Sequence, residues 1–254
     1  MKRLNLSPLT ESATLLRGVG VLLGSVGLTA IYSLLILLRA LFGRLNRSIV
    51  DKYCKEWSAT LLKLVRANLT VRGEVPDFDD GRRYIIMSTH ASHYDIPVSF
   101  VSLPGSIRML AKKELFRIPL LGSAMRAAEF PAVDRSSRTG ALRDLDNARK
   151  LMESGIVLWA APEGTRSADG QLLPFKKGCF HLALDTEAVI VPVAIRGISQ
   201  VLPARSLQIN LGQPVDVRVG SPIDTSGKSK EDLADLMLEV RQRMEELLGD
   251  GEAE

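Results

Sequence analysis

Cysteine, histidine and aromatic residues are scarce in this chain, and each scarcity excludes a class of protein. The only two cysteines, Cys54 and Cys179, provide no disulfide framework, which fits a reducing compartment. Aromatic residues make up 5% of the sequence and are not interleaved with basic ones, so a nucleic-acid-binding protein is not expected. His90-x-x-His93 and Cys179-x-His181 do not have the spacing of known zinc ligands, so no metal site is predicted.

Two common enzyme signatures are also absent. A serine esterase of the α/β-hydrolase type needs Gly-x-Ser-x-Gly after a strand, and the sequence contains no such segment. A phosphate-binding P-loop ending at Gly227-Lys228-Ser229 would need glycine five positions earlier, but residue 222 is proline. Both classes are therefore excluded.

The charge balance is mildly basic. A net charge of +4 and an isoelectric point near 9.1 suit contact with anionic lipid or with a phosphorylated substrate. The 254 residues are enough for one α/β domain with appendages.

The N-terminal region contains one long uncharged run, residues 18–38. As a helix it would be about 31 Å long, which matches the roughly 30 Å hydrocarbon core of a bilayer. Basic residues are denser after it than before it, which predicts a cytoplasmic C-terminal side. Apolar residues at helical spacing over 49–65 predict a second, amphipathic helix. The alternative is that the first helix is a core helix of a soluble protein.

The remainder alternates between apolar runs and helical patterns. A pattern of this kind predicts an α/β fold, a mostly parallel sheet covered by helices. We expect a membrane-associated segment at 1–68 and one α/β domain at 69–254, with a capped last helix after Ser229 and a short acidic tail. The expected strands are 69–72, 84–87, 107–110, 130–133, 156–160 and 189–195, with 207–211 and 215–219 extending one edge.

The segment from His90 to Asp95 is the strongest candidate site. It follows the strand at 84–87, and Pro97 fits only the first turn of a helix, so the helix should begin near Tyr94 or Asp95. His90 would then lie on the strand-to-helix turn, where Asp95 could fold back and fix the tautomer of its imidazole. The same spacing, Ser92-x-x-Asp95, also fits a simple capping box.

Other polar residues follow other strands. Lys112 follows the strand at 107–110, Arg135 the strand at 130–133, and Glu163 to Arg166 the strand at 156–160. Because parallel strands end at one crevice, these side chains should lie near His90, where arginines would suit a phosphate. Gly164 would allow close backbone approach, and Thr165 would add a hydroxyl donor. The alternatives are a local Glu163–Arg166 ion pair and a solvated Arg135.

Four segments in order resemble the motifs of the lysophosphatidate (1-acylglycerol-3-phosphate) acyltransferase family. They are His90-x4-Asp95, Asp134-Arg135, Pro-Glu-Gly-Thr-Arg-Ser at 162–167 and Val-Pro-Val at 191–193. The sequence departs from the family at Thr89, where asparagine is common, at Ala161, where phenylalanine is usual, and over 130–133 before Asp-Arg. The N-terminal helix pair is similar to that of bacterial members, which implies the cytoplasmic face of a bacterial inner membrane.

The resemblance implies acyl transfer from a thioester of acyl carrier protein or coenzyme A to the hydroxyl of 1-acylglycerol-3-phosphate. His90 would be the general base and Asp95 would orient it. Lys112, Arg135, Glu163, Gly164, Thr165 and Arg166 would bind the acceptor's phosphate and glycerol, and no cofactor would be needed. The alternatives are transfer to another lyso-lipid, such as lyso-ornithine lipid or a lysophosphodiester, and a non-catalytic lipid-binding module.

Overall fold

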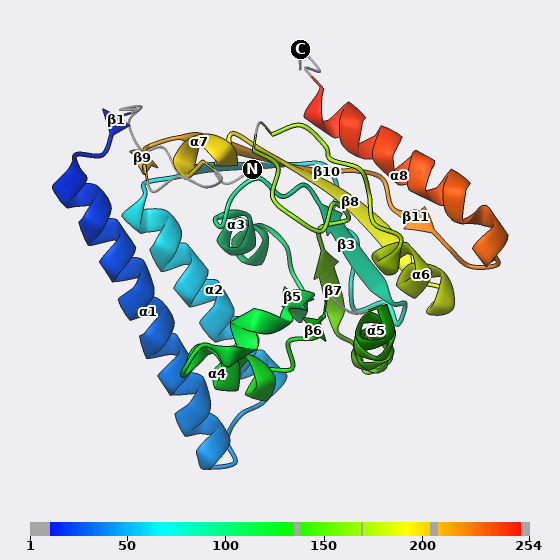
Figure 1. The fold of residues 1–254 in the computed structure, drawn as a ribbon, viewed down its shortest axis with the longest axis horizontal. Coiled ribbons are helices and arrows are strands. Elements are labelled where there is room, and N and C mark those ends of the chain that lie inside the picture. The colour runs from blue at the N-terminus through cyan, green and yellow to red at the C-terminus, as the bar shows by residue number, and fades with distance from the viewer. Residues whose placement is uncertain (1–10, 135–137, 169, 204–207, 250–254) are drawn as a thin grey trace.

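The computed structural model describes residues 11–134, 138–168, 170–203 and 208–249. Its centre is a mostly parallel sheet that is covered by helices on both faces (Figure 1). The sheet is built in the order β2 (Asn68–Arg72), β10 (Pro214–Val219), β8 (Val189–Arg196), β3 (Tyr84–Ser88), β7 (Val157–Ala160) and β4 (Ile107–Met109). The predicted fold class is confirmed.

Only β10 and β11 (Ile223–Asp224) run antiparallel to their neighbour β8; β10 pairs in parallel with β2. Every residue of β3 and β7 is buried, as continuous apolar runs in the middle of a parallel sheet require. The carboxyl ends of β3 and β7 point the same way, so the segments that follow them lie at one edge.

Two apolar layers enclose the sheet. One core joins it to α1 (Leu15–Leu41), α2 (Arg47–Leu64), α3 (Asp95–Ser102), α4 (Leu121–Ala127) and α7 (Ile198–Val201). The other joins it to α5 (Arg138–Glu153), α6 (Gly178–Asp185) and α8 (Leu233–Leu248). Short elements complete the chain: β1 (Glu11–Ser12), β5 (Ala111–Lys112), η1 (Lys113–Arg117), β6 (Ala132–Val133), β9 (Asn210–Leu211) and η2 (Lys230–Asp232).

The helix pair α1–α2 is held firmly against the rest of the chain. Arg108 in β4 is fully buried, and its guanidinium donates to Asp51 Oδ1 of α2 and to the Ala128 carbonyl after α4, both at 2.6 Å. Trp57 Nε1 donates to Thr29 Oγ1 at 3.1 Å between α2 and α1. Because the pair shares a core with the sheet, the boundary placed at 68/69 stays a prediction.

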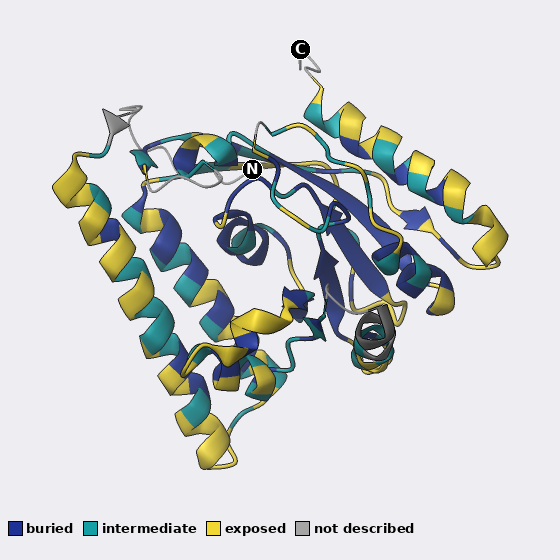
Figure 2. Cartoon of the chain, viewed as in Figure 1, coloured by how far each residue is buried: buried dark blue, intermediate teal, exposed yellow. Residues whose placement is uncertain are grey.

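Helix α1 is long and apolar enough to cross a membrane, and it is the one such helix among the described residues. Most of the large apolar side chains that are exposed in the structure lie on it (Figure 2). Only 17% of its most apolar stretch is buried, which argues against a core helix of a soluble protein.

The sequence prediction differs from the structure at several places. The strand predicted at 130–133 is only β6, which pairs with β5 in a separate two-stranded sheet. The segment predicted at 207–211 does not extend the sheet: β9 covers only Asn210–Leu211 and pairs with β1. Helix α6 was not predicted at all. Its eight residues are too few for a helical period to be distinct from a buried strand.

Candidate active site

The His90–Asp95 turn forms as the sequence predicts. β3 ends at Ser88 and α3 begins at Asp95, which brings Asp95 Oδ2 to 2.8 Å from His90 Nδ1. The same oxygen accepts the backbone N–H groups of Ala91 and Ser92, each at 2.8 Å. One carboxylate, 0% exposed, therefore holds both the histidine and the backbone of the turn, whereas the Ser92 side chain does not cap α3.

This geometry assigns the tautomer of His90. A carboxylate can only accept, so His90 Nδ1 carries a proton, and in the neutral imidazole Nε2 holds the lone pair. The imidazole also meets Trp159 at the end of β7 edge to face, with ring centroids 5.9 Å apart. His90 is thus held on two sides with one basic nitrogen available, which is the arrangement of a general base.

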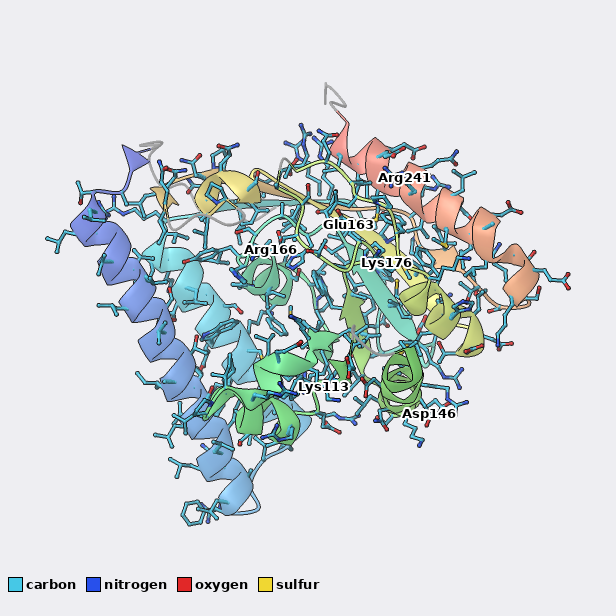
Figure 3. All side chains as sticks on the ribbon, viewed as in Figure 1. Lys113, Asp146, Glu163, Arg166, Lys176 and Arg241 are labelled. Carbon is cyan, nitrogen blue, oxygen red and sulfur yellow. The ribbon has the colours of Figure 1, made fainter. Side chains whose placement is uncertain are left out.

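Glu163 supports this turn through hydrogen bonds to its backbone, and its predicted role as a ligand of the acceptor stays a prediction. It is 1% exposed, and its carboxylate accepts the N–H of Leu173 at 2.8 Å and that of His90 at 3.4 Å. Burial raises the pKa of the Glu163 carboxyl, and the two backbone donors partly oppose that rise. Backbone donors rather than the Arg166 guanidinium are its partners, because the carboxylate turns toward the loop at 172–173 while Arg166 lies toward α3 (Figure 3).

We expect Glu163→Gln to destabilise the protein. Glutamine keeps the shape, but its amide NH₂ cannot accept the N–H of Leu173 or His90, and one unsatisfied buried donor costs about 1–3 kcal/mol. Urea unfolding followed by circular dichroism measures the change, with Glu153→Gln as control because Glu153 is exposed at the end of α5. An unchanged midpoint would contradict the supporting role.

An apolar cavity of about 540 Å³ leads away from His90. It runs between the sheet, α1, α2 and α4, and its walls include Tyr32, Trp57, Ala124 and Trp159. Most of its walls are apolar, as a fatty acyl chain would require. The sequence did not predict this wall, since it joins segments more than a hundred residues apart that carry no shared pattern.

The lining of this cavity includes three of the predicted cation and hydroxyl groups. Lys112, Thr165 and Arg166 line it together with His90 and His93. Partial burial and the nearby Arg166 and His90 lower the pKa of His93, so His93 is largely neutral at neutral pH. Lys112 is half-exposed and pairs with Glu114 at 3.4 Å, an exchangeable surface contact.

The two remaining predicted positions differ in their outcome. Gly164 adopts a positive φ of 71°, and a Cβ there would lie 3.2 Å from Lys176 Cγ, so it serves the tight turn that carries Thr165 and Arg166. Arg135 lies outside the described residues. Asp134 beside it is described, and its Oδ2 lies 3.2 Å from Lys113 Nζ.

Thr89, where the family commonly has asparagine, links two strands of the sheet. It is buried, and its Oγ1 accepts the N–H of Ile195 at 2.9 Å, which joins the end of β3 to β8. A second cavity of about 500 Å³ lies on this side of the His90 turn, and its lining includes residues of β8, Ser167, residues 170–172 and residues of α8.

Comparison with known proteins agrees with this site. The sequence model of the acyltransferase family matches residues 68–196, which contain the His90 turn and the segment 162–167. The chain belongs to the acyltransferase family.

The similar proteins are named for one activity. The chain is 36% identical to the 1-acyl-sn-glycerol-3-phosphate acyltransferase of Cocos nucifera over 59% of this chain and 48% of that protein. It is 32% identical to the human 1-acyl-sn-glycerol-3-phosphate acyltransferase alpha, over 66% of this chain and 59% of that protein. The matched segment is thus about half to three fifths of those relatives' length.

A solved structure matches almost the whole chain. The crystal structure of the 1-acyl-sn-glycerophosphate acyltransferase of Thermotoga maritima superposes with a TM-score of 0.74 at 26% identity, and the match covers 94% of this chain and 98% of that one. The helix pair therefore belongs to a fold that the two proteins share.

Proposed function

We propose that this protein transfers a fatty acyl group from a thioester to the free hydroxyl of 1-acylglycerol-3-phosphate, giving phosphatidic acid. The single observation that carries the proposal is one cavity whose lining includes His90, apolar side chains of α1, α2 and α4, and the polar side chains of Lys112, Thr165 and Arg166. The apolar walls suit an acyl chain, His90 suits the reacting hydroxyl, and the cations and the threonine hydroxyl suit a phosphate.

The chemistry follows from the state of His90. The acceptor hydroxyl attacks the thioester carbonyl as His90 Nε2 takes its proton, and a base so placed contributes roughly 10²–10⁴-fold. The tetrahedral intermediate collapses, the C–S bond breaks, and the imidazolium returns the proton to the leaving thiolate. Asp95 stabilises the imidazolium in between through its 2.8 Å contact with Nδ1.

No nucleophilic serine or cysteine is needed in this scheme, because the acceptor attacks the donor directly. Burial raises the pKa of the Cys54 and Cys179 thiols to about 12, so neither thiol provides a thiolate at neutral pH. The co-substrate is an acyl carrier protein or coenzyme A thioester.

The proposed setting is the surface of a membrane, with α1 in contact with lipid. The exposed apolar side chains of α1 would be costly in water and are satisfied by hydrocarbon. The positive-inside pattern of the sequence supports a cytoplasmic position for the α/β domain, and a bacterial inner membrane is the proposed location.

The test is an assay of purified protein with lysophosphatidate and both donors, acyl carrier protein and coenzyme A thioesters. Release of free thiol together with phosphatidate is expected from at least one donor. Transfer to a lysophosphodiester or to lyso-ornithine lipid, but not to lysophosphatidate, would favour the rival acceptors. Binding of lipid without any thiol release would favour a non-catalytic module.

The apolar cavity leads to a separate prediction about the length of the acyl chain that the enzyme accepts. Ala124 lies buried in its wall where α4 faces α1, so Ala124→Met places three more heavy atoms in the channel. We expect kcat/KM for long-chain donors to fall by about tenfold or more relative to short-chain donors, since a long chain loses apolar contact or strains the wall. Equal losses for both chain lengths would show that the acyl chain lies elsewhere.

A further inference from the structure

The turn that joins η1 to α4 exposes apolar side chains at a place where the α/β part otherwise exposes few. Leu115 is 39% exposed, and Ile118 and Leu120 are each 45% exposed. We call these three residues the 115–120 edge. Figure 2 shows this exposed stretch beside α4.

The backbone holds the 115–120 edge in place. Leu120 has a φ of +61°, a conformation that side-chain-bearing residues rarely adopt. A Cβ on Gly122 would lie 2.2 Å from the Phe116 carbonyl oxygen, and the Gly122 N–H donates to the Ile118 carbonyl at 2.9 Å. The turn is therefore closed tightly onto η1, and the exposure of Ile118 and Leu120 is fixed rather than a product of fraying.

Cations surround this edge. Lys112, Lys113, Arg117 and Arg126 are all exposed, and Lys113 is labelled on η1 in Figure 3. Glu114 and Asp134 pair with Lys112 and Lys113, which leaves a basic excess contributed by Arg117 and Arg126. An apolar tip with a basic rim matches the boundary between hydrocarbon and anionic headgroups.

The edge also adjoins the apolar cavity. Lys112, Leu115 and Leu121 line that cavity, and α4 packs against α1 (Figure 1). The exposed apolar surface of α1 therefore continues across α4 to the cavity that His90 lines.

We infer that the 115–120 edge is a second membrane-inserting element, which enters the interface of an anionic bilayer beside α1. Its occupant is lipid, and its consequence is that a lyso-lipid reaches His90 from the bilayer without crossing water. The inference rests on the proposed function, because entry from the bilayer matters only if the acceptor is a lipid.

A fluorescent probe at position 118 tests insertion directly. Cys54 and Cys179 are buried with thiol pKa values of about 12, so an Ile118→Cys variant can be labelled at one site. Vesicles of phosphatidylcholine and phosphatidylglycerol should shift its emission to shorter wavelength, and nitroxide lipids should quench it. Matched probes are Leu238→Cys on α8, where Leu238 is 55% exposed on the other layer, and Leu23→Cys on α1.

We expect quenching at 118 and 23 and none at 238. A probe at 118 that stays in water while the probe at 23 is quenched would overturn the inference. So would a probe at 118 that responds to an acidic acyl carrier protein and not to vesicles. Quenching at 118 without any acyl transfer to micellar lysophosphatidate would support insertion and count against the proposed function instead.

Activity gives an independent readout. The double variant Ile118→Asp with Leu120→Asn should lower kcat/KM for lysophosphatidate in vesicles about tenfold, since two apolar contacts with lipid are lost. The same variant should keep wild-type kcat/KM on detergent-dispersed substrate, and Leu238→Asp should leave both unchanged. Equal loss in vesicles and in detergent would contradict a role in entry from the bilayer.

Discussion

His90→Ala is expected to lower acyl transfer by at least a hundredfold while the protein stays folded. Nε2 of His90 is the proposed acceptor of the hydroxyl proton, and a positioned base contributes roughly 10²–10⁴-fold. His90 is only partly buried and its ring contacts one neighbouring aromatic ring, Trp159, so alanine leaves little empty core. The measurement is the rate of free thiol release from the acyl donor in the presence of lysophosphatidate.

Variants at two neighbouring residues distinguish loss of the general base from a general disturbance of the turn. Asp95→Asn should also be severely impaired, because an amide loses the charge that stabilises the imidazolium and can present NH₂ to the donors at His90, Ala91 and Ser92. His93→Ala should have only a mild effect, since His93 has no assigned proton to move. Retention by His90→Ala of more than about a tenth of the wild-type turnover would exclude the base role.

Arg166→Lys should raise the KM for lysophosphatidate and lower kcat together, although the charge is kept. A guanidinium can bind a phosphate through two parallel N–H groups, whereas an ammonium acts as a point charge. Loss of that orientation moves the acceptor hydroxyl away from His90, and misplacement of about 1 Å can cost roughly 10²-fold in rate. Steady-state kinetics with the acceptor varied at saturating donor measures both parameters.

The matched control is Arg149→Lys on α5, an exposed arginine that pairs with Asp146 at 2.6 Å far from the cavity. This control should behave as wild type. A change in KM for Arg166→Lys with kcat unchanged would mean that the arginine binds the acceptor without positioning it.

The His90–Asp95 contact could be predicted from the sequence because the residues that form it are close together in the chain. A buried strand, a proline in the first helical turn and a carboxylate five residues after His90 determine the His90–Asp95 contact, and all lie within fourteen residues, 84–97. Parallel strand order then brings Lys112, Thr165 and Arg166 to the same edge. These predictions need only short-range geometry and one rule of topology.

The rest of the site depends on long-range packing. Glu163 is predicted to bind the acceptor, with a local ion pair to Arg166 as the alternative, and its carboxylate accepts backbone N–H groups at positions 90 and 173. Backbone N–H groups are common to nearly all residues, so no residue type in the sequence identifies these two donors. The channel wall is likewise built by α1, α2 and α4, whose apolar faces predict burial but not which faces meet.

The most direct measurement of the central claim compares two acceptors that differ only in the phosphate. It is the ratio of kcat/KM for lysophosphatidate to kcat/KM for the monoacylglycerol of the same chain, both dispersed in the same micelles. The account predicts a ratio of at least about 100, since a phosphate held bidentately contributes to both binding and positioning, and a ratio that falls toward one in Arg166→Lys. A wild-type ratio near one would contradict the assignment of Lys112, Thr165 and Arg166 to a phosphate and leave His90 without its proposed substrate.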